Sequence, residues 1–294
     1  MRVLMSGASG LLGVAISRVL ETQGSQITRL VRKGPAPGEI LWHPGETLDP
    51  ALVSGFDAVI HLAGESVVGR WTAAKKQAIR DSRVLGTRTL ADAVANAAHK
   101  PGVFLAASAI GYYGNRGDEL LQETSAFGTG FLAETCREWE AAAQPVEKAC
   151  IRTVHMRTGI VLSKKGGALD KMLLPFRLGL GGRLGSGQQW MSWIHIDDIV
   201  GAMLHLLSDE KISGPINLVG PNPVRNTEFT AVLGTALSRP TIFSVPEFAL
   251  KLTMGQMAVE VLLGSQRVEP RQLTASGYDF KFRELSGALE NLLQ

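Results

Sequence analysis

Three glycines near the start of the chain have a spacing that suits phosphate binding. Gly7, Gly10 and Gly13 follow a short apolar run, Val3 to Met5, and open a segment with apolar residues on one helical face. This order predicts a buried strand, a tight turn and a helix N-terminus, whose free N–H groups and dipole attract phosphate. Gly7 would form the turn, Gly10 would admit a pyrophosphate, and Gly13 would let the helix pack on the strand. A plain tight turn is the alternative, but the context favours a dinucleotide site.

The end of the expected second strand, Gln26 to Val31, bears on which dinucleotide binds. An acidic residue there would accept hydrogen bonds from the ribose hydroxyls, whereas an arginine accommodates a 2′-phosphate. This strand runs into Arg32 and Lys33, with no acid nearby. Arg32 can form charge-assisted, forked hydrogen bonds to a phosphate. We therefore expect NADP(H), although basic residues also decorate ordinary solvated strand ends.

Strand-like and helix-like segments alternate through the first half of the chain. The pattern predicts an α/β fold, a Rossmann-like doubly wound parallel sheet with right-handed crossovers. In such a sheet, ligands bind outside the carboxyl ends of the strands. Further strands are expected at residues 57–62, 103–107 and 149–156, with a weak one at 39–42, and helices at 72–98 and 130–148.

The regular alternation of strand-like and helix-like segments ends after Val161. A Leu-rich helix up to Arg177, a glycine-dense loop from Gly179 to Gly187, a helix over 199–207 and a last strand over 216–219 are expected. Residues 223–294 are predicted to be mostly helical. We expect a Rossmann domain of residues 1–162 plus 195–222, and a small, mostly helical C-terminal cap of residues 163–194 plus 223–294. The cap should face the ends of the strands.

The composition excludes several classes of partner. Thirty basic and 27 acidic side chains among 294 residues give a formal charge of +3, with no basic stripe of the kind that binds nucleic acid. Cys136 and Cys150 have no metal-ligand spacing, so we expect reduced thiols and no metal. The first strand begins the chain and the apolar stretches are short. We therefore expect no signal peptide, no membrane span and a cytoplasmic protein.

Together these residues resemble the extended branch of the short-chain dehydrogenases/reductases. The Gly7–Gly13 turn, the segment His61-Leu-Ala-Gly64, the serine-rich segment ending in Tyr113-Gly114 and the segment Trp193–Asp198 match its motifs. The likeness is closer still to an atypical subgroup labelled epimerase family proteins. Its marks are residues 62–65, 70–71, 82–83, 139–140, 172–182, 185–187 and 264–267.

The resemblance and the glycine fingerprint together imply a set of NADP(H) contacts. By this resemblance, Arg83 would lie on the long helix beside the cofactor, where many extended members carry Asn. The expected cofactor residues are Gly7, Ser9, Gly10, Leu11, Leu12, Gly13, Val31, Arg32, Leu62, Ala63, Gly64, Arg83, Ala107, Ser108 and Gly159.

The chain lacks the usual proton-transfer pair of short-chain dehydrogenases. That pair is a Tyr and a Lys four residues apart on one helix face. The chain has three tyrosines, and none is followed four residues later by Lys. On the expected helix, the two positions are filled by Leu132 and Cys136 or, with a shift of one residue, by Phe131 and Thr135.

The catalytic candidates are Ser108, Tyr112 and Tyr113. The usual serine position falls on Ala109, so the adjacent Ser108 would either replace that serine or bond only to backbone. Tyr112 and Tyr113 would either transfer a proton or pack under the cap. His195 could act as an acid near neutral pH, although its position in the family favours a role at the domain junction.

Candidate substrate residues are Glu65, Gln189 and Trp193. Glu65 follows the cofactor loop and would reach the pocket, cap a helix or stay solvated. The Gly179–Gly187 loop lacks the Gly-Lys-Ser/Thr ending of a nucleotide P-loop. It would form a flexible lid, with Gln189 and Trp193 offering an amide and a ring to a ligand, or a packing turn.

Two functions follow from these observations. The first is an NADP(H)-dependent oxidoreductase or epimerase acting on an unidentified small molecule. The second is a catalytically silent NADP(H)-binding sensor or interaction protein. We expect a monomer, or a homodimer formed through the helices around residues 72–98 and 130–148.

Overall fold

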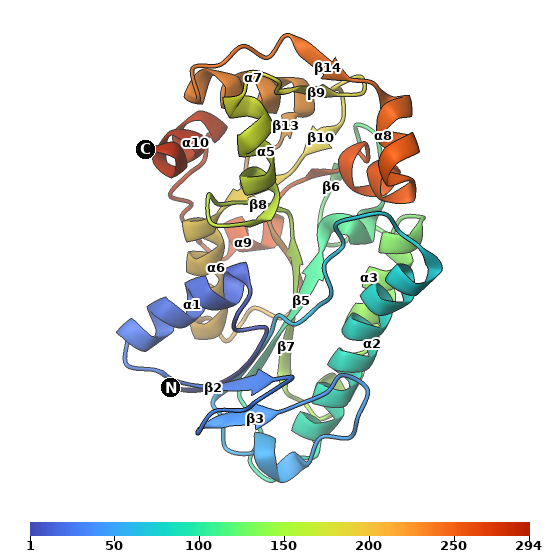
Figure 1. The fold of residues 1–294 in the computed structure, drawn as a ribbon. Helices are drawn as coiled ribbons and strands as arrows, with labels where there is room; N and C mark the ends of the chain where they lie inside the picture. Colours follow the sequence, from blue (N-terminus) through green and yellow to red (C-terminus); the bar gives the residue numbers. More distant parts are fainter.

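The computed structural model describes residues 1–294 and is built around a seven-stranded sheet (Figure 1). The strand order is β12-β7-β5-β4-β1-β2-β3, and all neighbouring pairs are parallel. The order reverses between β1 and β4, which opens a crevice at their carboxyl ends. The strands are β1 (Arg2–Ser6), β2 (Gln26–Val31), β3 (Glu39–Leu41), β4 (Ala58–His61), β5 (Val103–Ala109), β7 (Arg152–Thr158) and β12 (Gly214–Leu218).

Helices cover both faces of this sheet. On one face, α1 (Leu11–Thr22) and α6 (Ile196–Ser208) pack Ile16 and Met203 against Val3 and Met5. On the other face, α2 (Ala73–Ala95) and α4 (Gln144–Lys148) pack against alternate residues of the same strands. Because β1 and β4 are covered on both faces, they are apolar runs rather than alternating patterns. The expected Rossmann-like fold class is confirmed.

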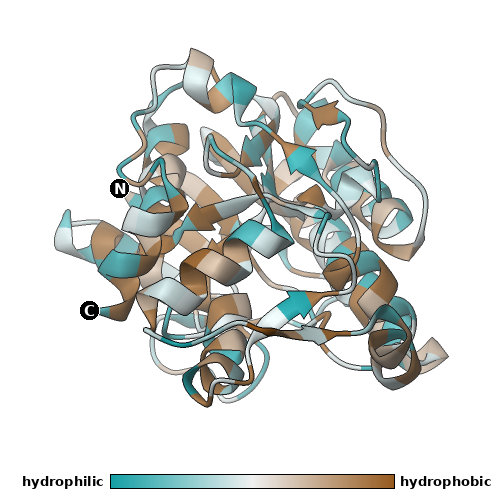
Figure 2. Ribbon diagram, turned by 90° about the horizontal axis from the view of Figure 1, so that it is seen from above, coloured by the Kyte–Doolittle hydropathy of each residue, from teal (hydrophilic) through white to brown (hydrophobic).

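The cap forms a second core above the sheet. Helices α5 (Gly167–Arg177), α7 (Asn226–Ala236) and α10 (Leu285–Leu293) pack around Phe176, Trp193 and Phe229. Seen from above, hydrophobic and hydrophilic stretches alternate along the surrounding helices (Figure 2). The remaining helices are α3 (Phe131–Ala141), α8 (Glu247–Met254), α9 (Arg271–Ala275), the short 3₁₀ turns η1 (Pro50–Val53) and η2 (Ile110–Tyr113), and the π-helical turn η3 (Ala258–Leu262).

Four short strand pairs join segments that are distant in sequence. The pairs are β6 (Leu120–Leu121) with β15 (Arg267–Val268), β8 (Ile160–Leu162) with β11 (Trp193–His195), β9 (Gly182–Leu184) with β14 (Phe243–Val245), and β10 (Trp190–Met191) with β13 (Val224–Arg225).

None of the helices combines the length and the apolar character needed to span a membrane.

The structure corrects several expected boundaries. The helix expected over 130–148 is two helices, since Pro145 has no N–H to continue the first one and instead opens α4. The strand expected from residue 149 begins at Arg152, because Cys150 turns the chain with a φ of 59°. Part of the glycine-dense loop is the strand β9. Leu273 and Phe280, from the expected cap, pack into the core of the sheet; the two-domain division itself stays a prediction.

Candidate functional site

The glycine turn after β1 has the geometry that its spacing predicted. Gly7 has a φ of +72°, and a Cβ there would lie 2.7 Å from the Leu62 carbonyl carbon, so only glycine fits. A Cβ on Gly13 would overlap the carbonyl oxygen of Gly7, which explains the close packing of α1 on this turn. A Cβ on Gly10 would meet only that oxygen, at 3.3 Å. The backbone at Gly10 is therefore open to a ligand.

The start of α1 is left without a capping side chain. Its N-cap is Gly10, which forms no side-chain hydrogen bond, and its first turn holds no acidic residue. The N–H groups of Leu11, Leu12 and Gly13 have no carbonyl partner within the helix. These N–H groups lie at the N-terminus of α1, which is also the positive end of the helix dipole. This end of α1 can bind an anion.

A groove of about 1100 Å³ runs beside this helix start. Arg32 lies exposed on its wall and forms no hydrogen bond or ion pair, whereas the neighbouring Arg29 pairs with Glu21 at 2.9 Å. Eight of the expected cofactor residues line this groove, together with a segment that sequence reasoning missed, Trp42 to Pro44 after β3. The eight are Gly7, Ser9, Gly10, Val31, Arg32, Leu62, Ala63 and Gly64.

A buried histidine, His61, supports the residues that form one wall of the groove. The Oγ of Ser6 lies 2.6 Å from Nδ1 of His61 and also accepts the backbone N–H of Ala63 at 3.3 Å. Nε2 of His61 lies 2.9 Å from the hydroxyl of Thr87, which accepts the indole N–H of Trp139. His61 is fully buried, and this burial lowers its pKa to about 4. The imidazole is therefore neutral at physiological pH.

Arg83 and Glu65 meet at the end of the groove. Nη1 of Arg83 donates to the carbonyl oxygens of Glu65 and Ile79, and its guanidinium lies over the Trp139 ring. Burial lowers the pKa of Arg83. The Glu65 carboxylate bonds to Nζ of Lys75 at 2.6 Å, which lowers the pKa of Glu65. Glu65 thus lines the cofactor groove, on the wall next to Gly64.

Ser108 belongs to a buried polar network at the ends of β5, β7 and β12. Its hydroxyl donates to Oε1 of Glu140 at 2.7 Å, and Arg157 grips the same carboxylate with two hydrogen bonds of 2.8 Å. Arg157 also donates to the Tyr113 hydroxyl, which donates to Asn217 at 2.7 Å. Sequence reasoning missed Arg157 and Asn217. The sequence did not single out Arg157, because its strand also holds Arg152 and His155.

Tyr112 and Tyr113 differ in how this network engages their hydroxyl groups. Tyr113 is completely buried, and both its proton and a lone pair are engaged within the chain, which argues against Tyr113 as a proton donor. Tyr112 is half-buried, its ring stacks on the Arg157 guanidinium at 3.5 Å, and its hydroxyl has no hydrogen-bond partner in the chain. Only Tyr112 can offer a hydroxyl to a ligand.

In the first of the two registers given above, the positions of the missing pair are Leu132 and Cys136, and both face this same region. A Cβ on Gly111 would lie 3.4 Å from Cβ of Leu132 and 3.7 Å from Sγ of Cys136. Leu132 has no exchangeable proton, and burial raises the pKa of the Cys136 thiol to about 12. Neither side chain can replace the usual acid or its cationic partner.

Two expected ligand residues serve the cap itself. Trp193 is fully buried and donates its indole N–H to the Asn222 carbonyl at 2.9 Å, which favours a packing role over contact with a ligand. The Gln189 amide donates to the carbonyl oxygens of Leu184 and Leu262. Gln189 also lines a pocket of about 410 Å³ that shares no residue with the cofactor groove.

His195 and Gly159 also have structural explanations. Nδ1 of His195 accepts the N–H of Asp197 and caps α6, while its ring lies 3.9 Å from that of Phe282. Burial lowers the pKa of His195. A Cβ on Gly159 would lie 2.5 Å from the Ser192 carbonyl oxygen, so packing alone requires this glycine. Ala107, Ser108 and Gly159 lie at the ends of β5 and β7, beyond the groove.

Comparisons with known proteins cover the whole chain. Residues 3–220 match the family described as the NAD dependent epimerase/dehydratase family, and residues 245–292 match a domain of unknown function, DUF1731. Epimerase family protein Mb2239 of Mycobacterium bovis is 43% identical over 291 residues, covering 98% of this chain and 96% of that protein.

Two solved structures are also similar. The human epimerase family protein SDR39U1, crystallised with NADPH, has a TM-score of 0.92 and 35% identity, covering 100% of this chain and 99% of that one. The nucleoside-diphosphate sugar epimerase from Corynebacterium glutamicum has a TM-score of 0.84 and 37% identity, covering 100% of this chain and 58% of that one.

Proposed function

The chain belongs to the NAD dependent epimerase/dehydratase family, and from this premise we propose that it is an NADP(H)-dependent oxidoreductase or epimerase acting on a small molecule. The observation that carries the proposal is the unpaired Arg32 guanidinium on the wall of a groove that begins at the uncapped start of α1. A cationic side chain at the end of the second strand and a free helix N-terminus suit the two phosphate-bearing parts of NADP(H).

The residues of the groove fit this cofactor. The backbone at Gly10 and the N–H groups of Leu11 and Leu12 would hold the pyrophosphate, and Arg32 would hold the 2′-phosphate. The human relative with the same fold was crystallised with NADPH. When bound, the cofactor supplies or accepts a hydride at C4 of its nicotinamide.

Proton transfer would fall to Tyr112. Its hydroxyl has no partner in the chain, and it follows β5, where the nicotinamide end of the site lies in this fold. The Ser108 proton is donated to Glu140, so the Ser108 oxygen can only accept a hydrogen bond from a substrate hydroxyl. Ser108 would therefore orient the substrate, and Tyr112 would give or take the proton as the hydride moves.

A catalytically silent NADP(H)-binding protein is the second candidate. The observation that favours it is the absence of a tyrosine and a lysine on α3, where Leu132 and Cys136 lie opposite Gly111. Losing a positioned general acid costs about 10²–10⁴ in rate. Such a protein would report the redox state of the NADP pool through its cap.

A single-turnover experiment separates the two candidates. The protein would be loaded with NADPH or NADP⁺ and mixed with a panel of carbonyl compounds and nucleotide sugars, while absorbance at the nicotinamide band is followed. We expect turnover with at least one compound, and a loss of about 10²–10⁴ in Tyr112→Phe. Tyr278→Phe is the matched control, since the hydroxyl of this tyrosine donates to the carbonyl of Asp198 on α6, outside the groove.

Two outcomes would overturn parts of this proposal. Tight NADPH binding without turnover on any compound would favour the silent protein. Full activity in Tyr112→Phe would remove Tyr112 as the proton donor.

A further inference from the structure

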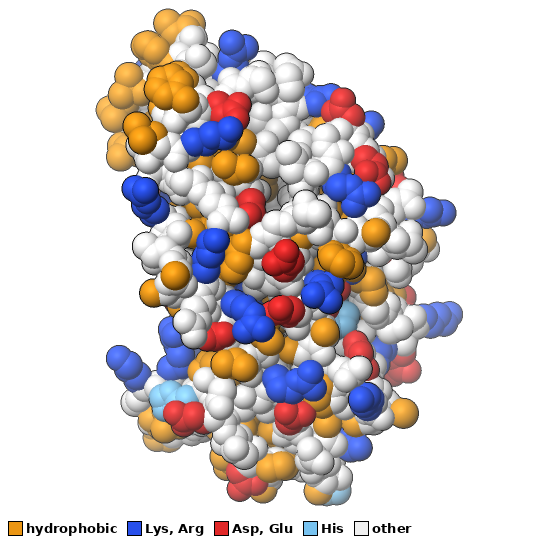
Figure 3. Space-filling view, turned by 90° about the vertical axis from the view of Figure 1, so that its right-hand side faces the viewer, with side chains coloured by type: hydrophobic (Ala, Val, Ile, Leu, Met, Phe, Trp, Pro, Cys, Tyr) orange, Lys and Arg blue, Asp and Glu red, His pale blue; other side chains and the backbone are white.

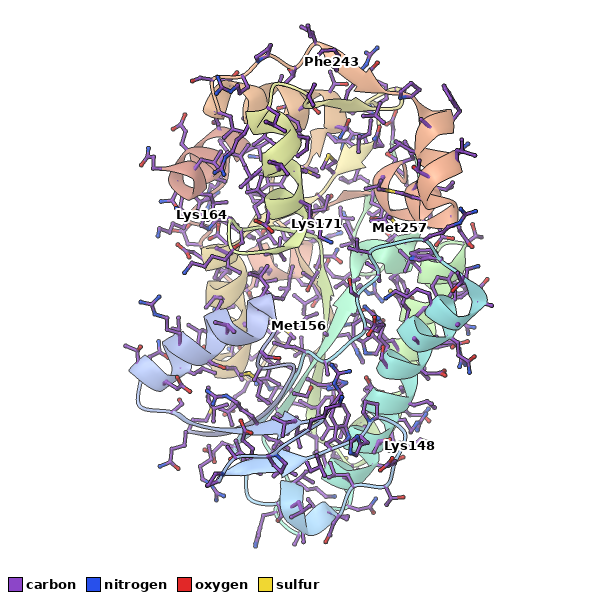
Figure 4. The ribbon with its side chains drawn as sticks, in the orientation of Figure 1. Lys148, Met156, Lys164, Lys171, Phe243 and Met257 are labelled. Carbon is purple, nitrogen blue, oxygen red and sulfur yellow. The ribbon has the colours of Figure 1, made fainter.

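The outer end of the cap carries a large exposed apolar surface, here called the outer cap face. Figure 3 shows hydrophobic side chains gathered at this upper end of the molecule, and Figure 4 labels Phe243 there, far from Met156 in the sheet. Each member exposes between 50% and 82% of its surface. The members are Leu178, Leu180, Ile242, Phe243, Phe248 and Leu252.

These residues form one continuous surface because three elements meet there. Strand β9 pairs with β14 so that Gly182 lies beside Phe243, and Leu180 and Ile242 lie within two residues of this meeting point. Nε of Arg239 donates to the Arg177 carbonyl, which ties the end of α5 to the segment before β14. Helix α8 follows β14 after a single residue, Pro246.

The same surface contains an open strand edge. Strand β9 is protected on its outer side, where the N–H of Leu184 donates to Oδ1 of Asn226 at 2.8 Å. The backbone of residues 242–245 bonds only to β9 and to Gly185, which directly follows β9. The outer side of β14 therefore has unpaired N–H and C=O groups beside exposed apolar side chains. Such an edge is a template for another strand.

The size of the outer cap face suits a protein partner. Its six side chains expose on the order of 700 Å², taking about 180 Å² for a large apolar side chain. The largest apolar patch on a typical monomer is about 300–600 Å². A standard protein–protein interface buries about 800 Å² on each partner. A lipid surface would cover the side chains but could not bond the open backbone groups of β14.

We propose that the outer cap face joins two copies of this chain across a twofold axis. Strand β14 of one copy would pair antiparallel with β14 of the other, which makes a continuous four-stranded sheet from two short pairs. A twofold contact uses the same patch on both copies, so an open edge and an apolar face can satisfy each other. The small formal charge of +3 leaves little net repulsion between copies. This interface lies outside the cofactor groove and does not depend on the proposed function.

Sedimentation velocity of the full chain over a range of micromolar concentrations tests the proposal. We expect a dimer for the wild type. In Ile242→Lys and in Phe248→Asp, the dissociation constant of the dimer should rise at least about tenfold, since either change would bury a charge. Both residues are highly exposed, so the fold should tolerate them. Leu52→Asp on η1 is the control, being 48% exposed but outside the outer cap face.

Hydrogen exchange adds an independent readout. Amides of residues 242–245 should be more protected in concentrated wild-type protein than in Phe248→Asp. A wild type that stays monomeric, or a dimer that survives both substitutions, would overturn the proposal. Binding of a monomeric wild type to phosphatidylserine vesicles, lost in Phe248→Asp, would also overturn it and would identify a lipid surface as the occupant.

Discussion

At the scale of single residues, Arg32 should decide between the two nicotinamide cofactors. Its guanidinium is unpaired and lines the groove, so it can meet the 2′-phosphate that only NADP(H) carries. Hydrogen bonds to charged groups contribute about 1.5–3 kcal/mol, which corresponds to roughly 10–150-fold in affinity. Arg32→Ala should therefore weaken NADPH binding by about that factor and leave NADH binding nearly unchanged. Fluorescence titration with both cofactors measures the difference.

Arg29→Ala provides the matched control for this titration. Arg29 lines the same groove, but its guanidinium is already paired with Glu21. We expect the ratio of NADPH to NADH affinity to stay close to that of the wild type. Equal losses for both cofactors in Arg32→Ala would contradict the role given to Arg32.

Residues could be predicted from the sequence where their role is local. Gly7 and Gly13 follow from a turn of seven residues, and Arg32 follows from its place at a strand end. Tyr113 could not be placed in the same way, because Asn217, its hydrogen-bond acceptor, arrives on β12 more than 100 residues later. The same is true of Arg157, whose partner Glu140 comes from a different element.

At the scale of elements, a glutamate from the C-terminal region caps α3. The carboxylate of Glu260 on η3 accepts the backbone N–H groups of Phe131 and Leu132 at 3.1 and 2.9 Å. It also faces the positive end of the helix dipole. Met257, labelled in Figure 4 beside these helices, packs on Trp71 and Ile79 of the same region. The C-terminal region is therefore held against α3, the helix that lies beside Tyr112.

Removing the Glu260 carboxylate from the start of α3 should lower the free energy of unfolding measurably. Glu260→Ala leaves two helix N–H groups without acceptors, and the loss of an N-cap costs about 0.5–2 kcal/mol. Urea unfolding at constant pH would measure the change in the free energy of unfolding. Gln256→Ala is the control, since Gln256 bonds only to Glu260 itself, and should change stability by less than about 0.5 kcal/mol. Equal stability of Glu260→Ala and wild type would refute the capping role.

Elements that bury a continuous apolar run or carry a clear helical period were predictable. Strands β1 and β4 follow from such apolar runs, and helix α1 follows from its apolar face. The four short pairs, such as β6 with β15, were not, because each strand has only two or three residues and its partner lies far along the chain. The cap's contact with α3 through Glu260 was missed for the same reason.

At the scale of the whole molecule, one buried histidine joins several parts of the fold. His61 ends β4, bonds to Ser6 at the end of β1 and to Thr87 on α2, and through Thr87 reaches Trp139 on α3. Its ring also packs against Trp42 and Phe104. The groups bonded to the imidazole are neutral hydroxyls, so nothing compensates a charge placed on it. Protonation of His61 therefore opposes folding of the entire sheet domain.

The stability of the protein should consequently fall in mild acid. The pKa of His61 is about 4 in the folded state and about 6.5 when unfolded, so the unfolded chain binds the additional proton between these values. Stability is then fully present above about pH 6.5 and is lost as the pH falls towards 4. Linkage gives a loss of about 2 kcal/mol between pH 7 and pH 5. Urea unfolding at both pH values measures this loss.

The control is His61→Gln, whose side chain keeps polar atoms but cannot titrate. In this variant, the difference in the free energy of unfolding between pH 7 and pH 5 should shrink by about the same amount. His195, whose pKa burial also lowers, remains in both proteins, so its contribution cancels in the comparison. An unchanged pH dependence in a folded His61→Gln protein would show that His61 is not the group that destabilises the fold in acid.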